Sequence, residues 1–108
     1  MAYLVVLTTT SSLSESRRLA RIVLEEKLAA CVSVSGPVMS SYRWKGKVQQ
    51  SREHLLMIKT VRKLFPLLEK TIKKNHSYKV PEILALPVVA GNKAYLKWLS
   101  KETLGVRR

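Results

Sequence analysis

The hydrophobic positions of the chain change period several times, and each change marks a predicted element. Residues 3–7 are apolar without alternation, and threonines and serines follow at residues 8–12. This pattern predicts a central strand that is buried on both faces and then leaves the sheet as a loop.

The next segment has a helical period. Ser12 and Glu15 have the spacing of a capping box, in which each side chain accepts a hydrogen bond from the other residue's backbone N–H, so we expect a helix to begin there. Its apolar residues recur every three or four positions, which predicts packing against a sheet: Leu19, Ala20, Val23, Leu24 and Leu28.

From residue 30 the period becomes two, which predicts strands. Two arms, residues 30–44 and 48–61, flank a turn at residues 45–47 and form a predicted hairpin. Gly36 and Pro37 interrupt the first arm, which indicates a bulge, a bend or an edge position, because proline cannot donate to a strand ladder.

Each arm has about 14 residues, well beyond the ~5–6 of an ordinary strand. The distal part carries Tyr42, Trp44 and Val48, whose apolar side chains would be exposed unless another chain covers them. The hairpin therefore predicts self-association.

The rest of the chain predicts a second amphipathic helix through Phe65, Leu68 and Ile72, a short strand at residues 83–89, and a last helix capped by Asn92. Pro87 suggests that the strand lies at a sheet edge. The order β-α-β-β-α-β-α predicts an α+β, ferredoxin-like split βαβ fold with an added helix, as one domain over residues 1–108.

The composition and charge of the chain limit the classes of function that it can have. The chain has 108 residues, 20 Lys plus Arg against 7 acids, all of them Glu, and a formal net charge of +13. The absence of Asp weakens sites that need clustered carboxylates. The basic residues are scattered and no RNA- or DNA-binding motif accompanies them, so nonspecific nucleic-acid association stays open as an alternative to a merely solvated surface.

One cysteine excludes an internal disulfide and fits a reducing compartment. No segment approaches the ~20 apolar residues of a membrane helix, so we expect a cytoplasmic protein without a membrane partner. Common catalytic motifs, including GxSxG, the P-loop and HExxH, do not occur.

Several residues remain open between chemistry and architecture. His76, Tyr78 and Glu82 share one loop, where His76 binds a ligand or caps the preceding helix. Cys31 is a soft metal ligand or a small buried side chain. Lys59, in an otherwise apolar strand, needs a carboxylate or a bound anion.

Five segments together resemble the CutA divalent-cation-tolerance family over nearly the whole chain. They are residues 27–32 (KLAACV), 41–46 (SYRWKG), 58–60 (IKT), 76–82 (HSYKVPE) and 95–98 (YLKW). The resemblance implies a ferredoxin-like subunit in a homotrimer similar to the PII signalling proteins. It also implies a non-enzymatic role in tolerance of divalent metals, copper first. Ser77 stands where the family usually has proline, so we expect a looser loop there.

By position, the resemblance implies metal ligands at clefts between subunits: His76, Cys31 and Glu82. It implies that these residues shape the pocket: Tyr42, Trp44, Glu53, Lys59 and Tyr78. A PII-like sensor that binds a small anion or a nucleotide through Lys59 and surface arginines is the alternative.

Overall fold

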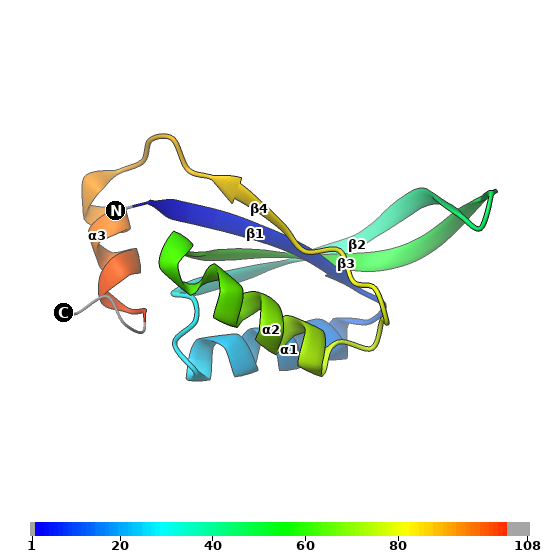
Figure 1. Ribbon diagram of the computed structural model, residues 1–108, viewed down its shortest axis with the longest axis horizontal. Helices are drawn as coiled ribbons and strands as arrows, with labels where there is room; N and C mark the ends of the chain where they lie inside the picture. Colours follow the sequence, from blue (N-terminus) through cyan, green and yellow to red (C-terminus); the bar gives the residue numbers. More distant parts are fainter. Residues whose placement is uncertain (1, 104–108) are drawn as a thin grey trace.

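The computed structural model describes residues 2–103, and its chain order confirms the predicted fold. The elements are β1 (Tyr3–Thr10), α1 (Leu13–Glu25), β2 (Cys31–Trp44), β3 (Lys47–Val61), α2 (Phe65–Asn75), β4 (Leu84–Pro87) and α3 (Lys93–Lys101). A 3₁₀ turn, Arg62–Leu64, leads into α2. The sheet order is β2-β3-β1-β4 with antiparallel neighbours, and α1 and α2 lie side by side on one face (Figure 1).

The main core lies between these two helices and the sheet. Its buried residues are Leu4, Val6, Leu19, Val23, Leu28, Ala29, Leu56, Ile58, Leu68 and Ile72. Along β1, Leu4 and Val6 are buried while the alternate residues Tyr3, Val5 and Leu7 are only half-buried. The expectation of burial on both faces is therefore wrong within one chain, because the helices cover a single face.

Strand β1 also runs further than predicted. Thr8, Thr9 and Thr10 stay in the ladder, opposite residues 54–56 of β3, and are buried. Threonine is β-branched and suits a strand, so the polar run continues the sheet instead of leaving it.

The hairpin is as long as its sequence predicts. Lys45 and Gly46 have φ values of 50° and 78°, which is the twisted two-residue turn that suits antiparallel strands. The register shifts between Val34 and Pro37, and β2 is an edge strand, as the interruption at Gly36 and Pro37 indicated. Strand β1 pairs with β3 only from His54 to Val61, so the distal hairpin has two strands and extends away from the body (Figure 1).

This extension makes the chain less compact than its size requires. The radius of gyration is 14.5 Å, where about 13 Å is usual for this length. The accessible surface is 7106 Å², against about 6,100 Å² for a monomer of this mass.

Helix α3 closes the opposite end of the sheet. Asn92 caps it as predicted, accepting the backbone N–H of Tyr95 at 3.0 Å. Leu99 packs with Val61 and Leu64 in a second, smaller core. Strand β4 is shorter than the predicted 83–89 and is an exposed edge, as Pro87 indicated.

Substitutions at two neighbouring leucines of α2 test whether the core lies only on the side of this helix that faces the sheet. Leu68→Ala removes a side chain that is 0% exposed and is expected to lower the free energy of unfolding by about 2–5 kcal/mol. Leu67→Ala, at 44% exposed, is expected to change it by less than about 0.5 kcal/mol. Urea denaturation measures both, and equal losses would contradict this placement of the core.

Candidate functional site

A cleft of about 650 Å³ lies between the distal hairpin and the segment that follows α2. It is lined by Thr9, Ser40, Ser41, Tyr42, Trp44, Ser51, Glu53, Tyr78, Lys79, Val80 and Glu82. Five residues that the sequence analysis assigned to the site therefore lie together: Tyr42, Trp44, Glu53, Tyr78 and Glu82. The hairpin and the loop are far apart in sequence, so only the fold joins them.

Glu53 and Tyr78 form the polar centre of this cleft. The Tyr78 hydroxyl donates to Glu53 Oε2 at 2.7 Å, and Glu53 is 7% exposed. Burial raises the pKa of Tyr78, and the hydrogen bond to Glu53 and its negative charge raise it further. Tyr78 therefore remains protonated and orients the Glu53 carboxylate.

His76 lies directly behind Tyr78 and has a structural role. It is the C-terminal cap residue of α2, and its side chain is fully buried. Its Nε2 donates to the Thr9 carbonyl at 2.8 Å, and its Nδ1 accepts the backbone N–H of Tyr78 at 3.0 Å. Both ring nitrogens are in use, so coordinating a metal ion would break one of these bonds.

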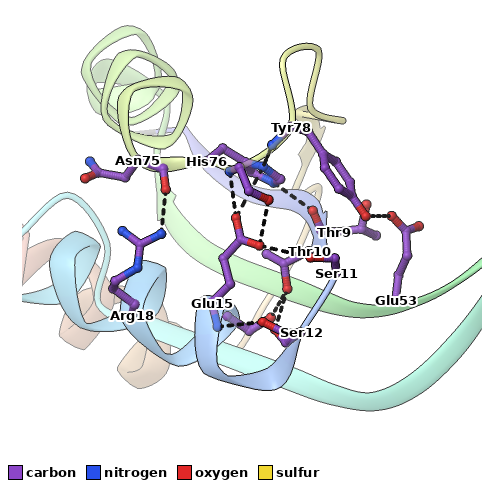
Figure 2. A network of polar contacts seen from close by, with 12 residues as sticks. Thr9, Thr10, Ser11, Ser12, Glu15, Arg18, Glu53, Asn75, His76 and Tyr78 are labelled. Atoms are coloured by element: carbon purple, nitrogen blue, oxygen red, sulfur yellow. Dashed lines mark hydrogen bonds and ion pairs between the residues drawn. The ribbon is translucent and has the colours of Figure 1, made fainter.

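Glu15 connects this loop to the start of α1, as Figure 2 shows. Ser77 donates to its carboxylate twice, from the backbone N–H at 2.8 Å and from Oγ at 2.9 Å. His76 Nδ1 lies 3.5 Å from Glu15 Oε2. Ser77 therefore anchors the loop through two hydrogen bonds, where the sequence predicted only a looser backbone.

These contacts change the ionisation of Glu15. Burial alone would raise the pKa of Glu15, but the two hydrogen bonds that its carboxylate accepts from Ser77 lower the pKa, which ends below its usual value of 4.5. The buried carboxylate is thus held in its charged form.

The capping box is only half formed. Ser12 Oγ accepts the backbone N–H of Glu15 at 3.1 Å, as predicted. The Glu15 carboxylate does not return to Ser12, because Ser77 and Ser11 are its donors. A spacing that indicates a local cap cannot reveal a partner 62 residues away.

Cys31 and Lys59 lie away from the cleft. They face each other on β2 and β3, and Lys59 Nζ donates to Ser33 Oγ at 2.6 Å and lies 3.8 Å from Cys31 Sγ. Cys31 is eleven residues from Tyr42 on β2, roughly 35 Å at the rise of a strand. Within one chain, the predicted thiol and lysine therefore do not join the other site residues.

The chain matches a known protein family over almost its whole length. The family described as CutA1 divalent ion tolerance protein matches residues 4–102. The chain belongs to this family.

Individual CutA relatives are similar over nearly the whole chain. The divalent-cation tolerance protein CutA of Thermus thermophilus is 46% identical over 99 residues, covering 92% of this chain and 96% of that protein. The chloroplastic protein CutA 1 of Oryza sativa is 45% identical over 93% of this chain, which spans only 56% of the rice protein.

Solved CutA1 structures agree with the fold. The Oryza sativa structure superposes with a TM-score of 0.95 at 43% identity, covering 97% of this chain and 96% of that one. The Thermus thermophilus structure has a TM-score of 0.92 at 44% identity, covering 94% and 98%.

The predicted metal ligands are spread over this chain. Among residues 2–103, no three His, Cys or Glu side chains lie close enough to hold an ion together. Glu82 lines the cleft, His76 is buried behind it and Cys31 is at the far end of β2. The three predicted ligands of one chain therefore do not fit one metal ion. Nor does any helix in the described range have the length and apolarity needed to cross a membrane.

The buried network around Glu15 predicts acid sensitivity. A lowered pKa means that Glu15 contributes stability above pH 4.5 and that this contribution is lost as pH falls through the lower folded value. Glu15→Gln is therefore expected to cost about 1–3 kcal/mol at neutral pH and to flatten the fall in stability below pH 4.5.

Denaturant unfolding across this pH range measures the effect. Glu25→Gln, at the exposed end of the same helix, is the control and is expected to cost less than about 0.5 kcal/mol. If the free energy of unfolding of Glu15→Gln fell below pH 4.5 as steeply as that of the wild type, the role of the network would be contradicted.

Proposed function

We propose that this chain acts in divalent-cation tolerance as a non-enzymatic homotrimer that binds divalent metal at clefts between its subunits. The observation that carries the proposal is the cleft itself. It places Glu53, Tyr42 and Trp44 of the hairpin beside Glu82 of the segment after α2, and β1 does not pair with this part of the hairpin.

Exposed apolar side chains support the assembly. On the distal hairpin Trp44 is 53% exposed and Val48 is 67% exposed, with Met39 and Tyr42 also exposed. Patches of this kind on a soluble protein usually meet a partner. A trimer of identical subunits uses two different surfaces of each chain, so a hairpin of one copy contacts the body of the next.

Assembly predicts a particle of three times 12.3 kDa. Sedimentation at micromolar concentration is expected to show it, and Trp44→Ser is expected to dissociate it at concentrations where the wild type stays assembled. Leu24→Gln, an exposed apolar position on α1, is the control and is expected to leave the mass unchanged. A wild type that sediments as a stable 12.3 kDa particle would refute the assembly.

The donor chemistry supports a divalent cation. Glu82 is exposed to the cleft, and Glu53 engages Tyr78 through Oε2. Copper is the first candidate because Cu²⁺ binds a given set of oxygen, nitrogen and sulfur ligands more tightly than its divalent neighbours. The remaining ligands then come from a neighbouring subunit, and Cys31, half-exposed at the other end of the sheet, is the thiol available for this.

His76 enters this proposal as a positioning residue. Its hydrogen bonds to Thr9 and to the Tyr78 backbone hold the loop that places Tyr78 against Glu53. In this role His76 supports the wall of the cleft instead of binding the metal ion.

A small-anion or nucleotide sensor is the second candidate. It is supported by Lys59, which is half-buried and has no carboxylate within ion-pair distance among the described residues. Lys59 does not line the cleft, whose own basic residue is Lys79. The sensor would therefore use a site other than the hairpin cleft.

Calorimetric titration with Cu²⁺ and Zn²⁺ separates these functions. Glu82→Gln keeps the shape of an exposed side chain and is expected to weaken Cu²⁺ binding at least about tenfold, because a charged ligand is removed. Glu69→Gln on α2 is the matched control and is expected to leave binding unchanged.

His76→Ala is measured beside them. It is expected to lower the unfolding temperature together with metal affinity, because two buried hydrogen bonds are removed. Equal metal uptake by the wild type and Glu82→Gln would refute the site. Heat on adding a nucleoside triphosphate in place of metal would favour the sensor.

A further inference from the structure

The outer surface of the helical layer carries an uneven charge. Helices α1 and α2 run antiparallel, so the first half of α1 lies beside the last half of α2 (Figure 1). Arg18 Nη2 donates to the Asn75 carbonyl at 2.9 Å and joins these two ends. Six exposed cations belong to these two helices between residues 17 and 21 and between residues 70 and 74, and we call them the basic patch: Arg17, Arg18, Arg21, Lys70, Lys73 and Lys74.

Little within the chain neutralises the basic patch. All six residues are exposed, and Glu69 is the acid of α2, paired with Lys73 at 3.9 Å. Within residues 2–103 none of the other five cations has a carboxylate within ion-pair distance. Glu25, one turn after Arg21, and the cap residue Glu26 are the exposed acids at the C-terminal end of α1, and neither forms an ion pair with the patch.

The helix dipole favours only part of this arrangement. Lys73 and Lys74, in the last turn of α2, lie at the favourable negative end of that helix, whereas Arg17 and Arg18, near the start of α1, lie at the less favourable positive end. Across the two helices, like charges repel and lower stability further. An anion that binds to the patch would relieve this repulsion, which favours a role in binding.

From this geometry we propose that the basic patch binds the phosphate backbone of double-stranded nucleic acid without reading its sequence. Clustered cations on a helical face complement the dense negative charge of a duplex. The described parts of α1 and α2 present no exposed aromatic residue, since Phe65 packs against the core, so the patch has no platform for stacking unpaired bases.

A membrane surface fits the patch less well. A helix that binds at a lipid interface inserts its apolar face, but the apolar faces of α1 and α2 are buried against the sheet. The patch also lies on the opposite side of the sheet from its uncovered face (Figure 1). A duplex bound to the patch would therefore leave the uncovered face of the sheet free for another chain. Duplex binding also does not depend on metal in the hairpin cleft.

Matched lysine variants test the proposal in the full chain. Lys70→Gln, Lys73→Gln and Lys74→Gln together remove three charges from the patch. Lys93→Gln, Lys97→Gln and Lys101→Gln together remove three from the exposed surface of α3. Fluorescence anisotropy with a labelled mixed-sequence DNA duplex, repeated over a range of salt concentrations, measures both, while sedimentation checks that assembly is unchanged.

The wild type is expected to bind at low salt with affinity that falls steeply as salt rises. The patch variant is expected to bind at least about tenfold more weakly. Its salt dependence is expected to be shallower, by about one unit of log–log slope for each phosphate that is no longer neutralised. The α3 variant is expected to bind less than about threefold more weakly.

Three outcomes would overturn the proposal. The first is an absence of duplex binding by the wild type at low salt. The second is an equal loss of affinity in both variants, which would mean that net charge alone is responsible. The third is selective loss of binding to phosphatidylserine vesicles in the patch variant with no duplex binding, which would assign the patch to lipid headgroups.

Discussion

Two helices can cover only one face of a four-stranded sheet, and the rest of this structure depends on that limit. The core forms where α1 and α2 meet β1 and β3, around Val6 and Leu56. The other face of β1 is half-buried, and among residues 2–103 the distal hairpin has no third strand beside it. The chain therefore has an incompletely covered apolar side and a charged helical side.

The cleft depends on a second constraint, the cost of burying a charged carboxylate. Glu15 is buried and charged because Ser77 donates to it twice, and this ties the loop after α2 to the start of α1. Through His76 and Tyr78 the same loop reaches Glu53 (Figure 2). A buried polar network of this kind holds its members in one arrangement because each unsatisfied group would be costly. The wall of the cleft is thus positioned by residues that do not line it.

The family match tells which proteins are related to this chain, and the internal contacts tell where its predicted ligands lie. The family match identifies the protein's relatives and agrees with its fold. The structure separates the predicted ligands. Both ring nitrogens of His76 already form hydrogen bonds, and Cys31 lies at the far end of β2. Oxygen-bearing side chains line the cleft of one chain, and Cys31 lies outside it.

The sequence alone determined the order of elements and most of their faces, because period, caps and turns are local. The turn at Lys45 and Gly46, the bulge near Pro37 and the cap at Asn92 all follow from a few adjacent residues. The family resemblance also grouped five residues that the fold brings together in the cleft.

Only the tertiary structure decided which distant groups meet. The spacing predicts a local cap for Glu15, whose carboxylate instead binds Ser77. Glu53 and Lys59, six residues apart on β3, lie roughly 20 Å from each other along the strand and join different neighbours. The arginines and lysines are scattered along the chain, yet the antiparallel helices bring Arg18 of α1 against the end of α2, the helix that carries Lys70, Lys73 and Lys74. Contacts of this kind depend on how the chain folds back on itself, and no local pattern encodes them.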